Sequence, residues 1–306
     1  MLTSVLATAE KIRKLEVQGA RNVAIAAINA LETLAKETHA KTRKTFIAEL
    51  TEAKTALFAT RETEPLMRNA LRWITNQVED SDERNPTELC NLVAQTSQKF
   101  QQTLNDSREC IAEIGAKRIR NGSTVFTHCR SSTVTYMLAK VFKEGKTFEV
   151  ICTETRPAFQ GRITAKEMLS LGIKTTFIVD SAARSFINNA DLVVVGADAI
   201  TSEGNVVNKI GTGAIALMAE EARKPFYVVS ELLKFDPATL YGDYERIEER
   251  SRNEVWPEAP PELNVRNPAF DVTPRDLIHG LICEEGIISP QSVAEVMHRV
   301  YPWVFQ

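Results

Sequence analysis

The stretch Ser123-Thr124-Val125-Phe126-Thr127-His128-Cys129-Arg130-Ser131-Ser132 decides the fold class of this chain. Its first half is a short apolar run with β-branched residues, which predicts a buried strand. Its second half is polar, and Ser131 and Ser132 are suited to cap a helix that begins at Thr133. A buried strand that leads directly into a helix is the repeating unit of parallel α/β sheets, so the thiol of Cys129 is expected at the ligand-binding edge of such a sheet.

Four further segments repeat this pattern of a β-branched run followed by an amphipathic stretch. The predicted strands are residues 123–129, 148–154, 175–180, 192–198 and 225–231. The last helix is expected over residues 291–301, after a proline-rich excursion at residues 256–274. Repeated βα units predict an α/β fold with a Rossmann-like, doubly wound parallel sheet.

The chain before this sheet has the apolar periodicity of helices throughout. Gly19 interrupts two apolar stripes and predicts a helical hairpin, and a third stripe after Pro86 predicts a long helix that ends near Gly115. We therefore expect two domains, an all-helical N-terminal domain over residues 1–115 and a C-terminal Rossmann-like catalytic domain over residues 116–306.

Composition excludes several classes of protein. The 306 residues are 43% hydrophobic and 25% charged, with a formal net charge of -3, which argues against a general nucleic-acid binder. No apolar run reaches the roughly 20 residues needed to span a bilayer. Five widely spaced cysteines and four scattered histidines give neither a disulfide framework nor metal-ligand spacing, so we expect a cytoplasmic protein with no metal and no cofactor.

The carboxyl ends of the predicted strands carry a thiol and four acids, namely Cys129, Glu154, Asp180, Asp198 and Glu231. The positive end of the following helix would lower the pKa of the Cys129 thiol and favour a thiolate that acts as a base. Asp198 follows two small residues, and partial desolvation there would let it donate a proton. A structural interpretation stays open for both, because acids often cap helices and cysteine is commonly a small buried hydrophobe.

Candidate anion sites occur in three places. The turn from Asn208 to Gly213 opens a helix, so its backbone N–H groups and Lys209 could hold a phosphate. A dinucleotide site is disfavoured there because Gly211 lies 13 residues beyond Asp198 and does not follow a strand end. The turn Gly19-Ala20-Arg21 and the lone Arg61 are weaker candidates, since surface arginines beside turns are common.

Several motifs taken together have the order of a known family. They are Gly19-Ala20-Arg21, Arg61, Thr127-His128-Cys129, Glu154-Thr155-Arg156-Pro157 with Gln160-Gly161, Gly196-Ala197-Asp198, Asn208-Lys209-Ile210-Gly211-Thr212 and Asn267-Pro268-Ala269-Phe270-Asp271-Val272-Thr273-Pro274. Nearly the whole chain resembles the family that unites archaeal ribose-1,5-bisphosphate isomerase, 5-methylthioribose-1-phosphate isomerase and the regulatory subunits of translation initiation factor 2B.

The resemblance implies an aldose-ketose isomerase in which Cys129 and Asp198 are catalytic, because the family's non-catalytic alpha subunit has lost this pair. It also implies that a sugar phosphate is bound by Gly19, Ala20, Arg21, Arg61, Ser131, Ser132, Asn208, Lys209 and Lys234. Chain length and the segment from Lys234 to Pro237 favour ribose 1,5-bisphosphate as substrate, in nucleotide salvage.

The resemblance further implies AMP as an activator and a homodimer that assembles to a homohexamer. Two departures from the family's isomerases stand out, since Gln18 replaces a usual arginine and no lysine lies near Ser132. The alternatives are a non-catalytic subunit like that of the translation factor and a 5-methylthioribose-1-phosphate isomerase.

Overall fold

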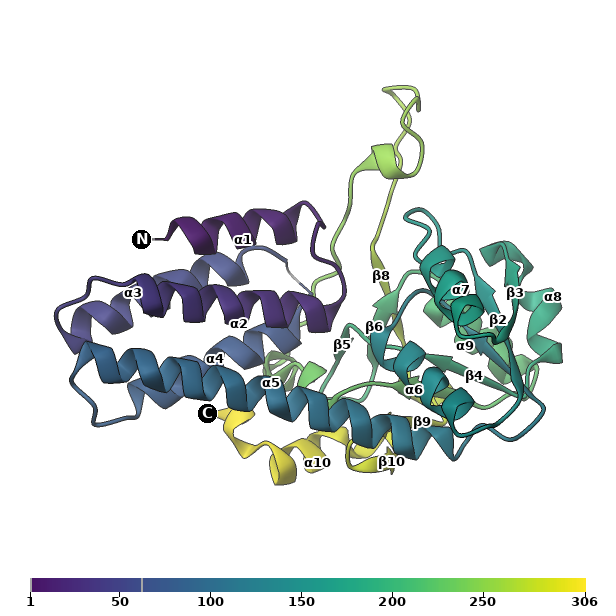
Figure 1. The fold of residues 1–306 in the computed structure, drawn as a ribbon. Helices are drawn as coiled ribbons and strands as arrows, with labels where there is room; N and C mark the ends of the chain where they lie inside the picture. The colour runs from purple at the N-terminus through teal and green to yellow at the C-terminus, as the bar shows by residue number, and fades with distance from the viewer. Residues whose placement is uncertain (1, 62) are drawn as a thin grey trace. The chain divides into compact units, whose positions relative to one another are not determined.

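The computed structural model describes residues 2–61 and 63–306 (Figure 1). The chain divides into two compact units, one of residues up to Asp106 together with Tyr301–Gln306, and one of Ser107–Val300. The expected domain border at residue 115 stays a prediction.

The first unit is helical. Its helices are α1 (Thr3–Arg13), α2 (Ala20–Glu37), α3 (Arg43–Phe58), α4 (Pro65–Glu79) and the first part of α5 (Pro86–Ala116). Gly19, with a φ of 84°, separates α1 from α2, so the helical hairpin is confirmed. The predicted apolar stripe of α2 is buried, and the ring of Trp303 from the chain end packs on Trp73 and Phe100.

The second unit contains a seven-stranded sheet with the order β10-β9-β7-β4-β1-β2-β3. Its strands are β1 (Ser123–Thr127), β2 (Phe148–Thr153), β3 (Lys174–Ile178), β4 (Leu192–Val195), β7 (Phe226–Val229), β9 (Gly280–Cys283) and β10 (Gly286–Ile288). All neighbouring pairs are parallel except β9 and β10. The chain runs outward from β1 in one direction and from β4 in the other, which confirms the doubly wound fold.

Helices cover both faces of this sheet. They are α6 (Ser132–Lys143), α7 (Gly161–Ser170), α8 (Ala183–Phe186), α9 (Thr212–Glu221) and α10 (Val293–Val300). Val125, Val150 and Val194 form a core with residues of α5, α6 and α7. Phe126 and Val193 are also buried and, because side chains alternate along a strand, they face the other side. Strands covered on both faces explain the continuous apolar runs in the sequence.

A small second sheet, of order β5-β6-β8, was not predicted. Its antiparallel strands are β5 (Ala199–Ile200), β6 (Val206–Lys209) and β8 (Phe270–Thr273). The segment between Tyr241 and β8 projects from the second unit as a long loop (Figure 1). The proline-rich excursion therefore ends in a strand, and two more strands, β9 and β10, precede the last helix.

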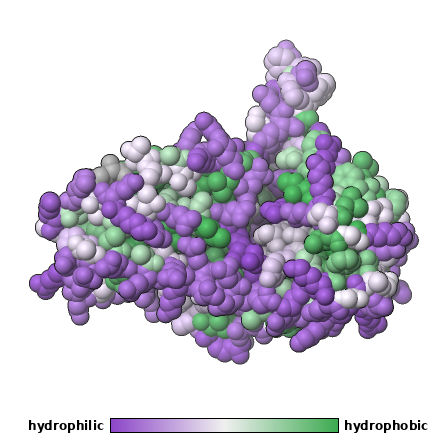
Figure 2. Space-filling model, viewed as in Figure 1, coloured by the Kyte–Doolittle hydropathy of each residue, from purple (hydrophilic) through white to green (hydrophobic). Residues whose placement is uncertain are grey.

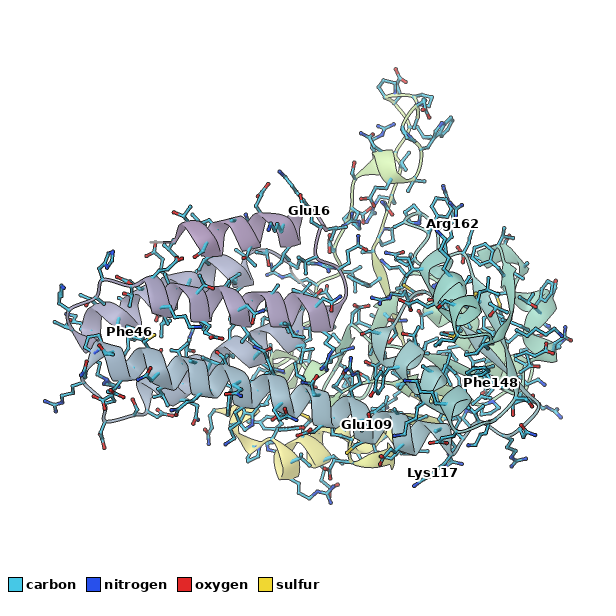
Figure 3. All side chains as sticks on the ribbon, viewed as in Figure 1. Glu16, Phe46, Glu109, Lys117, Phe148 and Arg162 are labelled. Carbon is cyan, nitrogen blue, oxygen red and sulfur yellow. The ribbon has the colours of Figure 1, made fainter. Side chains whose placement is uncertain are left out.

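Polar contacts fasten the end of α5 to α6 within the second unit. Glu109 of α5, labelled in Figure 3, accepts hydrogen bonds from the Tyr136 hydroxyl and the Lys140 ammonium of α6. These bonds, with the apolar contacts of Ile111 and Ala112, hold α6 in place. Because α6 begins three residues after Cys129, they also steady the segment that carries the thiol.

The surface is mostly polar, but apolar residues gather over α6 and α7 (Figure 2). Ile163 and Leu169 of α7 are among the exposed large apolar side chains. In residues 2–61 and 63–306, no helix combines the length and the apolar character required to cross a membrane.

Candidate functional site

Cys129 and Asp198 follow the two strands at which the sheet reverses its direction of winding. Cys129 lies two residues after β1 and Asp198 lies three residues after β4, and these strands pair with Phe126 opposite Val193. In open α/β sheets the crevice at such a reversal is the usual ligand site. The fold therefore brings the two predicted catalytic residues to one edge of the sheet.

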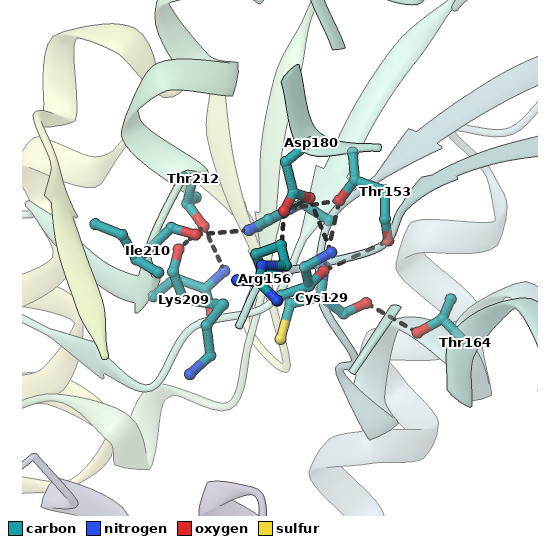
Figure 4. Close-up of polar contacts among 12 residues, drawn as sticks. Cys129, Thr153, Arg156, Thr164, Asp180, Lys209, Ile210 and Thr212 are labelled. Carbon is teal, nitrogen blue, oxygen red and sulfur yellow. Dashed lines mark hydrogen bonds and ion pairs between the residues drawn. The ribbon is translucent and has the colours of Figure 1, made fainter. Parts of the chain in front are cut away.

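The backbone of Cys129 is held in an unusual conformation. Its φ is 65°, in the left-handed region that residues other than glycine seldom adopt. The Cys129 N–H donates to the Thr155 hydroxyl at 3.0 Å, and the Cys129 carbonyl accepts from the Thr164 hydroxyl at 2.8 Å (Figure 4). Two hydroxyl groups from neighbouring segments thus fix the direction of the thiol.

Asp180, predicted to join the site through its carboxylate, has a supporting role in the structure. Its two carboxylate oxygens accept hydrogen bonds from the backbone N–H groups of Thr155 and Arg156, at 2.8 and 2.7 Å. Thr155 itself has a φ of 65°. Asp180 therefore fixes the turn at Thr155, which in turn binds the Cys129 N–H. In Figure 4 the Cys129 sulfur points away from Asp180.

The prediction of a resting thiolate is wrong. Burial raises the pKa of the Cys129 thiol to about 11, and the nearby carboxylates of Asp198 and Asp180 raise it further. The Lys209 charge and the N–H of Arg130 oppose this shift and are outweighed. The sequence argument considered the helix end but could not include desolvation, which is the largest cause. In the resting protein Cys129 is a neutral thiol.

Ser131 packs tightly against the strand that leads to Asp198. Its hydroxyl caps α6 by accepting the Val134 N–H at 3.3 Å, as predicted, and Ser132 is the first residue of that helix. A Cβ placed on Gly196 would lie 2.6 Å from both Cβ and Oγ of Ser131. Only glycine permits this approach, so Gly196 sets how closely the Cys129–Ser131 segment lies to the segment that carries Asp198.

The side chain of Arg130 is directed to α7. Its Nε and Nη2 donate to the same carboxylate oxygen of Glu167, at 3.3 and 3.0 Å. Arg130 therefore does not replace the lysine that is missing near Ser132.

The β5–β6 hairpin returns the chain beside Asp198. The Asp198 N–H donates to the Val207 carbonyl at 2.9 Å, which places Asn208 and Lys209 next to it along β6. Asn208 is buried and donates to the Thr212 hydroxyl at 2.9 Å. The Lys209 ammonium lies 4.8 Å from the centre of the Phe270 ring, and its charge reaches the Cys129 thiol.

The predicted backbone phosphate site at the start of α9 is already occupied. The carboxylate of Asp271, on β8, accepts the N–H of Gly211 at 2.8 Å and the N–H of Gly213 at 3.1 Å. A phosphate would compete with this carboxylate, so the prediction that these N–H groups are open is wrong. The side chains of Asn208 and Lys209 remain the predicted phosphate ligands of the turn.

Lys234 lies behind the strand end that carries Asp198. It is 5% exposed, and its ammonium donates to the Ala197 carbonyl at 2.8 Å and lies 3.4 Å from Glu231. Glu231 in turn accepts from the Thr133 hydroxyl at 3.0 Å. Glu231, another of the four acids predicted at the strand ends, is thus part of a buried polar network that holds Lys234 beside the site.

The remaining predicted substrate residues belong to the first unit. Gly19 precedes α2, Ala20 is buried, and the Arg21 guanidinium donates to the Leu104 carbonyl at 2.8 Å and the Asn105 side chain at 2.7 Å. Arg61 forms an ion pair of 2.7 Å with the buried Glu64. Their role in binding stays a prediction.

Four residues that support the site were not predicted to do so. They are His128, Thr155, Thr164 and Asp271. Three of them stood in the motifs that suggested the family, but the partners that matter for the site lie 25 to 82 residues away in the chain, so spacing gave no signal for these contacts.

Comparisons with known proteins agree with this architecture. The ribose 1,5-bisphosphate isomerase of Archaeoglobus fulgidus is 45% identical over 292 residues, which make up 95% of this chain and 91% of that protein. The crystal structure of translation initiation factor eIF-2B from Pyrococcus horikoshii OT3 matches with a TM-score of 0.83 at 29% identity, over 95% of this chain and 98% of that chain.

A crystal structure of 5-methylthioribose 1-phosphate isomerase from Pyrococcus horikoshii OT3 matches with a TM-score of 0.80, also at 29% identity, over 98% of this chain and 88% of that chain. The sequence model of the initiation factor 2 subunit family matches residues 16–290. Because this match spans most of the sequence, the chain belongs to the initiation factor 2 subunit family.

Proposed function

We propose that this protein is an aldose-ketose isomerase that converts ribose 1,5-bisphosphate to ribulose 1,5-bisphosphate. The observation that carries the proposal is a thiol and a carboxylate at the reversal point of the sheet, with the charge of Lys209 acting on the thiol. The near full-length similarity to an isomerase of this substrate supports it.

The reaction requires an acid and a base. A furanose phosphorylated at C1 has no free aldehyde, so the bond between C1 and the ring oxygen must break while that oxygen receives a proton. Removal of the C2 proton then gives an enol phosphate, and protonation at C1 with loss of the C2 hydroxyl proton gives the ketose. We assign proton delivery to Asp198 and removal of the C2 proton to Cys129.

The neutral thiol of the resting protein supplies the proton for the first step. In our proposal the Cys129 proton passes by way of Asp198 to the ring oxygen, which leaves the sulfur as a thiolate. The thiolate removes the C2 proton and returns it at C1, while the Asp198 carboxylate takes the proton of the C2 hydroxyl. The pair ends with the single proton it had at the start, ready to return to sulfur.

Phosphate binding falls to cations and polar groups near this pair. We propose Lys209, Lys234 and Asn208 for this role, together with Ser131 and Ser132, whose helix start favours negative charge. Gly19, Ala20, Arg21 and Arg61 stay predicted substrate residues, each to be tested by mutation.

The decisive experiment incubates the purified protein with ribose 1,5-bisphosphate and follows the phosphorus NMR spectrum. We expect the two phosphate signals of ribulose 1,5-bisphosphate to replace those of the substrate. The double variant C129S/D198N serves as the matched control and should leave the spectrum unchanged.

The likeness to a 5-methylthioribose 1-phosphate isomerase, and the missing cation at Gln18, favour that activity as the second candidate. Turnover of 5-methylthioribose 1-phosphate but not of the bisphosphate would establish it. Turnover of neither substrate would favour a non-catalytic regulatory subunit like that of the translation factor.

We further propose a cytoplasmic enzyme of nucleotide salvage that AMP activates. Activation requires AMP to bind one conformational state of the enzyme more tightly than the other. A tenfold difference in affinity between the two states corresponds to a coupling free energy of about 1.4 kcal/mol. Initial rates at subsaturating substrate, with and without millimolar AMP, test this point. No change in rate together with no AMP binding by calorimetry would reject it.

We also propose a homodimer that assembles to a homohexamer. The exposed apolar side chains over α7 support association, because such patches commonly mark interfaces. Light scattering at micromolar concentration should give a mass above that of one chain, and a monomer would contradict the proposal.

A further inference from the structure

His128, the residue before Cys129, connects two segments of the candidate site. It is 2% exposed. Its Nδ1 lies 2.6 Å from the Thr153 hydroxyl at the end of β2, and its Nε2 lies 2.9 Å from the Ile210 carbonyl in the turn after Lys209. One imidazole thus spans from the thiol-bearing strand to the lysine-bearing turn.

The contacts define the proton positions on the ring. A carbonyl oxygen can only accept a hydrogen bond, so Nε2 must carry the proton that it gives to Ile210. Burial lowers the pKa of His128, which favours the neutral ring. In a neutral ring with a proton on Nε2, Nδ1 accepts, and the Thr153 hydroxyl donates to it. Both nitrogens are therefore engaged within the protein.

The turn closes directly on the edge of the imidazole. A Cβ added to Gly211 would lie 3.3 Å from both Cε1 and Nε2 of His128, and Gly211 has a φ of 102°. On its other side the turn is tied by the Ile210 N–H to the Ala269 carbonyl, at 3.1 Å. The ring is thus the element that sets how far the turn stands from β1.

Lys209 depends on the same turn. Its carbonyl accepts the Thr212 hydroxyl at 2.6 Å, one residue beyond Gly211. The ammonium acts on the Cys129 thiol through its charge, so a shift of the turn would change the field at sulfur and the place offered to a phosphate.

We propose that His128 is a positioning residue that sets Lys209 against Cys129 through the hydrogen bond from Nε2 to the Ile210 carbonyl. The inference rests on the proposed isomerase function for its kinetic consequence but not for its structural one. His128 does not act on substrate, because both of its nitrogens are committed inside the protein.

Two amide replacements separate the two ring contacts. The side-chain amide of glutamine reaches the place of Nε2, and that of asparagine reaches the place of Nδ1. His128→Gln keeps a donor for the Ile210 carbonyl, whereas His128→Asn keeps only a partner for Thr153. Thr153→Val is the reciprocal control, since it removes the Nδ1 contact and leaves the Nε2 bond.

Hydrogen exchange measured by mass spectrometry over residues 206–213 gives a readout that needs no activity. In H128N these amides should exchange about tenfold faster than in the wild type, as expected when a hydrogen bond that closes a turn is lost. In H128Q and T153V the exchange rates of these amides should stay within about twofold of the wild-type rates. Equal exchange in H128N and H128Q, or faster exchange in T153V than in H128N, would overturn the proposal.

Kinetics provide the functional readout. H128N should raise KM for ribose 1,5-bisphosphate about tenfold with a smaller fall in kcat, and H128Q should restore most of that loss. If no variant and no wild-type protein turns over substrate, the isomerase function fails while the exchange result still decides the role of His128.

A measurement on the wild-type protein applies even if H128N does not fold. The chain has four histidines, so nitrogen-15 labelling of histidine gives a small set of signals. We expect His128 to be neutral at pH 7 with its proton on Nε2. A proton on Nδ1 alone, or a charged ring, would refute the assigned hydrogen bond.

Discussion

The Cys129 thiol should be the least readily ionised group of the proposed catalytic pair, and this can be measured by alkylation. A rise in pKa from 9.0 to about 11 corresponds to about 2.7 kcal/mol against the thiolate, at about 1.36 kcal/mol for each unit. At pH 7 about one molecule in 10⁴ carries the thiolate, which is the reactive form. The rate of alkylation should therefore be about 100-fold below that of an unperturbed thiol.

The assay treats the protein with iodoacetamide over a range of pH and quantifies the peptide that contains Cys129 by mass spectrometry. Cys110, which is exposed, serves as the internal reference because it is reached by reagent without rearrangement. The Cys129 rate should keep rising to the highest pH at which the fold persists. An inflection at about pH 9.0 or below, where an unperturbed thiol ionises, would refute the desolvation argument.

Two substitutions should move the Cys129 rate in opposite directions. Asp198→Asn removes a charge that raises the pKa of the thiol, so alkylation at pH 9 should become faster. Lys209→Met removes a charge that lowers it, so alkylation should become slower. Shifts of the same sign would show that access of reagent, and not the electric field, controls the reaction.

Three further predictions concern catalysis, packing and pH. Cys129→Ser and Asp198→Asn should each lower kcat at least about 100-fold while substrate binding persists, which steady-state rates and calorimetry measure; near wild-type kcat would refute the assigned role. Gly196→Ala should reduce the free energy of unfolding by about 1–3 kcal/mol in denaturant titrations, because the new Cβ overlaps Ser131, and Ser131→Gly in the same chain should restore part of that loss. Burial lowers the pKa of His128 in the folded protein, so below about pH 6.5 the unfolded chain binds one more proton than the folded chain. As the pH is lowered through this range, the free energy of unfolding should therefore decrease by up to about 1.36 kcal/mol per pH unit. His128→Gln should remove this part of the pH dependence, which denaturant titrations at several pH values measure.

The strands of the main sheet were largely predictable, and the reason lies in burial. The run Leu192–Val195 is apolar and buried at every position because it is covered on both faces, and β1 and β2 are buried at every position but one each. The short strands β5, β6 and β8 were missed. Strands of two to four residues are too short to show a periodicity, and β8, the partner of β6, follows more than 60 residues after it.

The site was predictable in its residues but not in its chemical state. Cys129 and Asp198 stood out because polar groups ended apolar strands, and the sheet places those strands side by side. The pKa of the thiol depends on atoms packed around it from distant segments, which sequence spacing does not reveal. Asp271, whose carboxylate accepts the N–H groups at the start of α9, lies 60 residues beyond Gly211, so this contact could not be predicted from the sequence either.

The position of Asp271 in the chain bears on when the protein becomes active during its synthesis. Translation delivers Cys129, Asp198, Lys209 and Lys234 before it delivers β8. Until β8 pairs with β6, the N–H groups at the start of α9 lack their carboxylate and the Lys209 turn is unsupported on one side. A nascent chain on the ribosome therefore holds every proposed catalytic group before the Lys209 turn has this support, and we expect a product truncated before β8 to lose the proposed phosphate site although Cys129 and Asp198 are present.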